Sequence, residues 1–221
     1  MQKLIDGLHK FKAEVFDSSK ELLQPLVNGQ RPEVLFVSCA DCRVAPDLIT
    51  QTDPGELFIL RNAGNIVPPF GVSSSGEAAA LELALLALGV RHIIVCGHTN
   101  CSAMSELIDP RLGEDAPALR AWLTHAEAAR RVVEENYPDV SGPARLTVTV
   151  EENVLAQIEH LRSHPAVRVR VARGELSLHG WVYKMETGEV FQYDPEQAQF
   201  VAFVQAPRSS SMRPEAPPPS P

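Results

Sequence analysis

Two short apolar runs, each followed at once by cysteine, histidine or charged residues, constrain the fold of this chain most. Residues 34–37 precede Cys39-Ala40-Asp41-Cys42-Arg43, and residues 93–96 lead into His98-Thr99-Asn100-Cys101. Apolar runs of this length are typical of buried strands. If the two strands are parallel neighbours, both blocks lie at the carboxyl edge of one sheet, where α/β proteins place their functional residues.

Two thiols and one imidazole could then meet at one point. Two thiolates neutralise the charge of a zinc ion, so Cys39, His98 and Cys101 are a suitable zinc ligand set. The fourth position could be closed by Cys42, because Cys39-x-x-Cys42 followed by His98-x-x-Cys101 has the ligand spacing of a zinc ribbon.

An open fourth position fits the local chemistry better than a closed one. Structural zinc usually stabilises small domains that lack a core, whereas 44% of the 221 residues of this chain are hydrophobic. Asp41 lies two residues from Arg43, and an acid held by a fixed cation can orient water on a metal. The sequence therefore favours a catalytic zinc site over a structural one.

The order of the remaining patterns predicts an α/β fold with a mostly parallel central sheet flanked by helices. A strand at residues 57–60 and a helix at 75–88 lie between the two blocks, and a strand-helix-strand unit enforces parallel pairing. Further predictions are a helix at 117–136, a strand at 146–150, a helix at 151–163, and a closing C-terminal hairpin formed by 176–183 and 190–193.

The two ends of the chain differ from its centre. Residues 1–24 carry helical spacing of apolar side chains and predict an N-terminal helical arm that must bury its stripe on another surface. Residues 207–221 are rich in proline and serine and predict a disordered tail. The expected domain is therefore 1–206, with the arm at its start.

Composition limits the range of partners. A net charge of −8 argues against nucleic acid as a partner. No apolar run approaches the roughly 18 residues that span a bilayer, and the amino terminus lacks the apolar segment of a signal peptide. Cysteines in two tight clusters indicate a reducing compartment. We therefore expect a cytoplasmic protein without membrane contact.

The other histidines have less specific patterns. His125, His160 and His164 fit ordinary helix-surface positions, whereas His179 fits a hydrogen-bonded core histidine. Cys96, at the end of a buried strand, fits a small core residue.

Four blocks in register carry a family resemblance. They are Cys39-x-Asp41-x-Arg43-Val44, the run Arg61-Asn-Ala-Gly-Asn-Ile-Val-Pro-Pro69, Cys96-Gly-His-Thr-Asn-Cys101, and Leu178-His-Gly-Trp-Val-Tyr183. Their order and spacing over about residues 1 to 200 resemble the β-class carbonic anhydrases, in particular the cyanobacterial and plant-like branch.

The resemblance implies roles for specific residues. Cys39, His98 and Cys101 would hold one Zn²⁺ per chain, and Asp41 and Arg43 would form the catalytic dyad. Asp41 would also be able to take the fourth metal position and shut the site at low pH. Gln30 and Phe58 would line the substrate pocket, and Arg61 would lie beyond the metal ligands.

The resemblance also implies a reaction and partners. The expected reaction is the reversible hydration of CO2 to bicarbonate and a proton. The expected assembly is a homodimer or a higher oligomer built from dimers, with the N-terminal helix packed across a partner subunit. If the chain comes from a carbon-fixing bacterium, a carboxysomal location with shell or scaffold proteins as partners is also expected.

Several residues depart from the pattern of the family. Cys42 replaces the usual serine, Leu83 stands where a tyrosine is common, and Ser102-Ala103 and Ser73-Ser74-Ser75 replace stretches that contain glycine. These departures favour an alternative hypothesis, a low-activity or inactive homologue that keeps zinc for structure or assembly.

A redox role is a third hypothesis, because Cys39-Ala40-Asp41-Cys42 could form a disulfide. It is disfavoured because Pro46 ends the segment soon afterwards, and because His98 and Cys101 would have no role.

Overall fold

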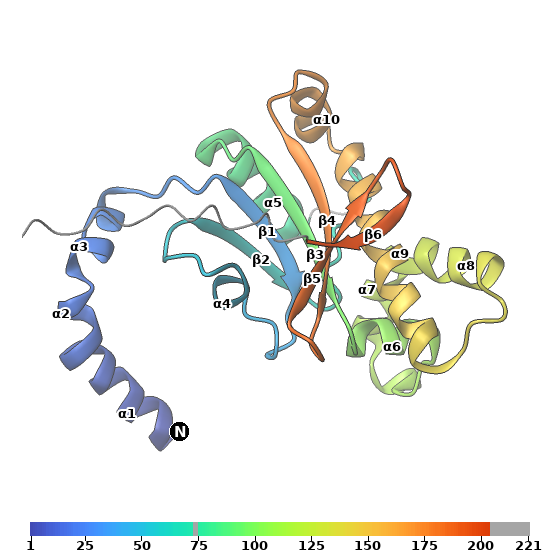
Figure 1. The fold of residues 1–221 in the computed structure, drawn as a ribbon, viewed down its shortest axis with the longest axis horizontal. Coiled ribbons are helices and arrows are strands. Elements are labelled where there is room, and N and C mark those ends of the chain that lie inside the picture. Colours follow the sequence, from blue (N-terminus) through green and yellow to red (C-terminus); the bar gives the residue numbers. More distant parts are fainter. Residues whose placement is uncertain (73–74, 204–221) are drawn as a thin grey trace, which may run out of the picture.

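A central six-stranded sheet organises the computed structural model, which describes residues 1–72 and 75–203 (Figure 1). The strand order is β2-β1-β3-β4-β5-β6. Strands β1 to β4 are parallel to one another, β5 is antiparallel to β4, and β6 is antiparallel to β5. The strands are β1 Val34–Cys39, β2 Leu57–Asn62, β3 His92–His98, β4 Ser177–Lys184, β5 Glu189–Asp194 and β6 Gln199–Ala202. The predicted α/β class and its mostly parallel sheet are confirmed.

Helices connect the strands and flank the sheet (Figure 1). The α-helices are α1 Gln2–Lys10, α2 Phe16–Ser18, α3 Lys20–Leu23, α4 Pro46–Thr50, α5 Gly76–Glu82, α6 Ser102–Ile108, α7 Pro117–Leu123, α8 Glu127–Asn136, α9 Gly142–Ser163 and α10 Pro165–Ala172. The π-helices are η1 Phe11–Val15 and η3 Leu83–Leu88, and the 3₁₀-helices are η2 Pro25–Asn28, η4 Gly113–Asp115 and η5 Thr124–Ala126.

Both faces of the sheet are covered, but the cluster of buried apolar residues on one face is larger than that on the other. Alternate residues of β1 and β3, such as Leu35 and Ile93, enter the larger core cluster, whereas Phe36 and Ile94 enter a smaller one on the other side. Helix α9 crosses β3 and β4 on the larger side. A Cβ at Gly97 would lie 2.7 Å from Val150 Cγ1, so only glycine lets α9 approach the sheet here.

The predicted strand at residues 146–150 is wrong, because this segment lies inside α9. The alternation Leu-Thr-Val-Thr-Val is typical of a strand, yet Pro143 starts a helix at its N-terminal turn. Each threonine hydroxyl is satisfied within the helix, since Thr147 donates to Pro143 O and Thr149 donates to Arg145 O. Val150 and Val154 then share one buried face.

The helix predicted at 117–136 is divided by η5 into α7 and α8. The predicted helix at 75–88 and the closing hairpin are present. Ser75 caps α5 by accepting a hydrogen bond from Ala78 N–H, and Gly89, with φ +71°, ends the following η3. The hairpin of β4 and β5 is present, but the sequence did not predict its extension by β6.

The N-terminal segment extends away from the sheet as an arm (Figure 1). None of the residues in α1 to α3 is buried, and the arm exposes Leu4, Leu8, Phe11 and Val15. None of the helices in the described part of the chain is both long and apolar enough to cross a membrane. The predicted disordered tail, 207–221, lies outside the described residues.

Two histidines differ from their predicted surface positions. His164 is 5% exposed, and its Nε2 lies 2.9 Å from Pro68 O. His160 is half-buried, and burial lowers its pKa. His179 is hydrogen-bonded as predicted, since its Nε2 lies 3.3 Å from Nδ1 of His92, but it is half-buried and not a core residue. Cys96 is buried as expected, and burial raises its pKa to about 12.

Candidate metal centre

Three buried side chains meet at the carboxyl edge of the sheet. Cys39 ends β1, His98 ends the adjacent β3, and Cys101 precedes the first turn of α6. Their ligand atoms lie within 4.8 Å of one another. The parallel pairing of β1 and β3 therefore brings together residues about 60 positions apart in the sequence.

The geometry of these residues fits a zinc ion. Two sulfurs at about 2.3 Å from one tetrahedral zinc ion lie about 3.8 Å apart, and Cys39 Sγ lies 3.9 Å from Cys101 Sγ. His98 Nδ1 lies 2.9 Å from Thr99 O, which leaves Nε2 as the free lone pair. That Nε2 is buried and has no hydrogen-bond partner among the described residues. A bound metal would satisfy it.

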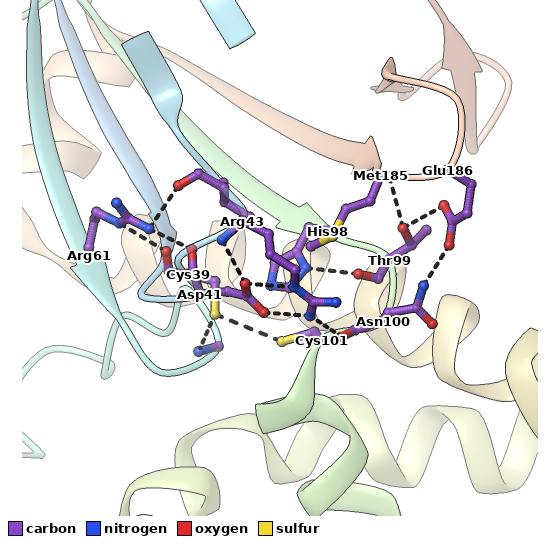
Figure 2. A network of polar contacts seen from close by, with 12 residues as sticks. Cys39, Asp41, Arg43, Arg61, His98, Thr99, Asn100, Cys101, Met185 and Glu186 are labelled. Carbon is purple, nitrogen blue, oxygen red and sulfur yellow. Dashed lines mark hydrogen bonds and ion pairs between the residues drawn. The ribbon is translucent and has the colours of Figure 1, made fainter. Parts of the chain in front are cut away.

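The fourth position of this group is open in the described part of the chain. Cys42 is exposed and is not one of the grouped ligands, which disfavours the closed, four-ligand alternative. Asp41 is not in the group either, because its carboxylate faces Arg43 (Figure 2). The role of Asp41 as a fourth ligand at low pH stays a prediction.

The two thiols form one hydrogen-bonded pair. The hydrogen bond between the sulfurs lowers the pKa of Cys39, and contacts with His98 and the Gly64 N–H lower it further. The pKa of Cys101 is raised by the contact with Cys39 and by burial. Gly64 N donates to Cys39 Sγ at 3.4 Å. This environment thus favours a thiolate at one of the two sulfurs.

Asp41 and Arg43 form a bidentate ion pair beside the group (Figure 2). Arg43 Nε lies 2.9 Å from Asp41 Oδ1, and Nη2 lies 2.7 Å from Oδ2. The Arg43 side chain holds the pKa of Asp41 well below its usual range. The Asp41 side chain is only 11% exposed, so this carboxylate is fixed in place and ionised at neutral pH.

Comparison with known proteins agrees with this geometry. A family model described as carbonic anhydrase matches residues 34–190. A solved structure, "The structure of the beta-carbonic anhydrase CcaA", superposes with a TM-score of 0.89 at 49% identity and covers 91% of this chain and 98% of its own. This chain belongs to the β-class carbonic anhydrases.

Curated relatives support the same family over nearly the full described chain. A carbonic anhydrase of Synechocystis is 49% identical over 91% of this chain and 74% of its own length. A carbonic anhydrase of Pseudomonas aeruginosa is 42% identical over 94% of both chains. A structure of "two tetrameric beta-carbonic anhydrases" from Sordaria macrospora has a TM-score of 0.77 at 26% identity, over 86% of this chain and 95% of its own.

In this β-class carbonic anhydrase, Arg61 donates hydrogen bonds to the backbone of the loop that follows β1 (Figure 2). Its Nη2 donates to Asp41 O at 2.7 Å and to Val44 O at 2.8 Å, and its Nε donates to Cys39 O at 3.1 Å. Arg61 therefore fixes the backbone that carries one sulfur and the carboxylate, without entering the ligand group.

The hydrogen bonds from Thr99 and Asn100 to Glu186, which we call the Glu186 clamp, were not predicted from the sequence. Glu186, in the turn between β4 and β5, accepts Thr99 Oγ1 at 2.7 Å and Asn100 Nδ2 at 2.6 Å (Figure 2). Asn100 has a left-handed backbone with φ +55°, and its carbonyl accepts Arg43 Nη2 at 3.0 Å. Glu186 thus connects to the ion pair through Asn100. The only sequence signal was an acid in a turn after a strand that pairs with β3.

A pocket of about 350 Å³ opens onto the metal side. Cys39 and Asp41 contribute to its lining, and Ala63, Ala103 and Leu119 make much of the rest apolar. Ser102 and Glu106 also line it, so one of the departures from the family lies at the pocket.

The predicted substrate residues do not line this pocket within one chain. Gln30 lies in the loop before β1, and Phe58 pairs with Leu35, four residues before Cys39. At about 3.3 Å per residue, Phe58 is separated from Cys39 by about 13 Å along the strands. Leu83 is 49% exposed on η3 and does not line the pocket either.

Proposed function

We propose that this protein catalyses the zinc-dependent reversible hydration of CO2 to bicarbonate and a proton. The observation that carries the proposal is the open group of Cys39, His98 and Cys101 next to the ionised Asp41. When bound there, zinc would supply the Lewis acidity that ionises water near neutral pH.

The residues around the group have complementary roles in this proposal. Ionised Asp41 can only accept hydrogen bonds, so it orients the O–H of the attacking water and leaves the oxygen lone pair directed at carbon. Through two parallel hydrogen bonds, Arg43 keeps the Asp41 carboxylate ionised and fixed in position. The apolar walls formed by Ala63, Ala103 and Leu119 suit CO2, whereas bicarbonate, as an anion, leaves toward water.

Assembly is part of the same proposal. We propose a homodimer, or a higher oligomer of dimers, in which a second copy covers the arm and supplies Gln30 and Phe58 to the substrate pocket. The exposed apolar residues of the arm support this, as do the place of Gln30 before β1 and the separation of Phe58 from Cys39 along the strands of one chain. The Sordaria macrospora relatives, which are tetrameric β-carbonic anhydrases, agree with an assembly of this kind.

Deletion of residues 1–24 is expected to yield monomer or aggregate in place of the oligomer. The deletion removes the apolar stripe of Leu4, Leu8, Phe11 and Val15, whose burial at an interface would favour association. Light scattering coupled to size-exclusion chromatography at micromolar concentration measures the mass. A full-length protein that is a well-behaved monomer under these conditions would refute the proposed assembly.

Glu186→Ala is expected to lower kcat/KM for CO2 hydration by about tenfold while zinc content is unchanged, since partners beyond the ligands typically matter on this scale. The change removes both acceptors that hold Thr99 and Asn100. Glu189→Ala, an exposed acid in the same hairpin, is the matched control and should leave the rate unchanged. Equal rates in the Glu186 variant and wild type would show that the clamp is dispensable.

We place the protein in the cytoplasm, with a carboxysomal location and shell or scaffold partners if its source fixes carbon. Fractionation of the source cells, with detection of the native chain in the cytosolic or the carboxysome fraction, decides between the two. Recovery in the membrane fraction would contradict both.

A further inference from the structure

We propose that Asn153 and Gln157, two buried amides on α9, are positioning residues that aim the Gly64 N–H at the Cys39 sulfur. The inference rests on the proposed zinc site. The two amides lie on α9, whereas the metal ligands and the Asp41–Arg43 pair lie on other elements.

Gly64 connects α9 to the Cys39 sulfur through two hydrogen bonds. Asn153 Nδ2 donates to Gly64 O at 3.0 Å, and Gly64 N donates to Cys39 Sγ at 3.4 Å. Gly64 has φ +83°, and a Cβ there would lie 2.8 Å from Met104 Cε, so this position requires glycine. The Gly64 carbonyl and N–H lie in the two peptide planes that meet at its Cα, and Trp122 Nε1 holds the second plane by donating to Ala63 O at 2.8 Å. The hold on the Gly64 carbonyl therefore restrains the backbone from which the N–H reaches the sulfur.

Gln157 fixes Asn153 and the far end of the same loop. Gln157 Nε2 donates to Asn153 Oδ1 at 3.0 Å, which leaves Asn153 Nδ2 as the group that faces Gly64. Gln157 Oε1 accepts Val67 N–H at 2.9 Å. The two amides, one helical turn apart, therefore hold residues 64 and 67 from the same helix face.

The burial of these amides requires an explanation. Asn153 is 1% exposed and Gln157 is 0% exposed, on a helix whose nearby core positions are Val150, Val154 and Leu161. A buried amide contributes little to stability compared with a well-packed apolar side chain, and costs stability if it loses its partners. Its contribution here is instead an oriented hydrogen bond to the sulfur, which moderates the charge that the sulfur donates to a bound metal.

The test compares Asn153→Leu with Thr149→Val in the full-length protein. Leucine removes the donor to Gly64. Thr149 is equally buried one turn earlier on α9, but its hydroxyl bonds only within the helix, to Arg145 O. Zinc affinity is measured by competition with a chromogenic chelator, and the sulfur-to-metal absorption band is recorded after cobalt substitution.

We expect Asn153→Leu to weaken zinc binding by about tenfold and to shift the cobalt–thiolate band, with Thr149→Val unchanged in both. Gln157→Met should act in the same direction, and it decides the question alone if Asn153→Leu fails to fold. Wild-type affinity and spectrum in the folded Asn153 and Gln157 variants would overturn the inference, as would an equal loss in Thr149→Val.

These readouts separate the inference from the proposed function. A wild type that binds zinc but does not hydrate CO2 would contradict the proposed function and leave the affinity test valid. An active wild type with unaffected variants would contradict the inference alone.

Discussion

Cys101→Ser is expected to lose its zinc to a chelator that leaves the wild type loaded, and to lose CO2 hydration with the metal. A structural zinc site contributes roughly 10–16 kcal/mol, so loss of one of three protein ligands removes on the order of 4 kcal/mol, or about 10³-fold in affinity. The stability of the domain should fall as well, because Cys101 is 1% exposed and metal binding is linked to folding. Zinc per chain is measured by atomic absorption, and stability by thermal denaturation.

Cys42→Ser is the matched control for this prediction. Cys42 is three residues from Cys39 but is exposed and outside the ligand group, so zinc content should be unchanged. If the two serine variants lost zinc to the same extent, the closed four-ligand site would be correct and the open catalytic site wrong.

Asp41→Asn is expected to reduce kcat/KM for CO2 hydration by on the order of 10²- to 10³-fold with zinc content retained. Asparagine keeps the shape of the side chain but presents an N–H₂ group to the guanidinium of Arg43, which also only donates. The bidentate pair is then lost, and with it the fixed acceptor beside the metal. Stopped-flow hydration assays on zinc-counted protein measure the effect, and a variant that keeps half of the wild-type rate would remove Asp41 from the mechanism.

The direction of the Asp41 pKa shift also predicts an acid dependence. Because Arg43 lowers the pKa of folded Asp41, the pair stabilises the fold fully above the unfolded pKa of about 3.9. That stabilisation is lost as the pH falls below this value toward the folded pKa. Through neutral pH Asp41 stays ionised, so its own titration should not limit the rate there. Denaturation followed from neutral to acid pH, compared between wild type and Asp41→Asn, should show a smaller acid loss in the variant.

The sequence was sufficient to predict the position of the ligand group. Apolar runs that lead directly into Cys39 and His98 indicated parallel strands, and parallel pairing places both strand ends together. The Asp41–Arg43 pair was predictable for the same reason, since it lies within the loop that follows β1.

Long-range supports were beyond sequence reasoning. Glu186 lies 86 residues after its partner Asn100, and Asn153 lies 89 residues after its partner Gly64. A lone acid or amide has no periodic signal in the sequence. The error at residues 146–150 has a related cause. Its alternating β-branched pattern is local, whereas the burial of Val150 and Val154 against Gly97 is tertiary and favours the helix.

The hydration rate of the purified full-length protein, with its zinc counted, tests the central claim most directly. We expect metal-dependent CO2 hydration that scales with bound zinc and persists from about pH 6 to about pH 9. A protein with one zinc per chain and no hydration over that range would contradict the account. It would favour the inactive homologue, with Cys42, Leu83 and Ser102 as the departures that explain it.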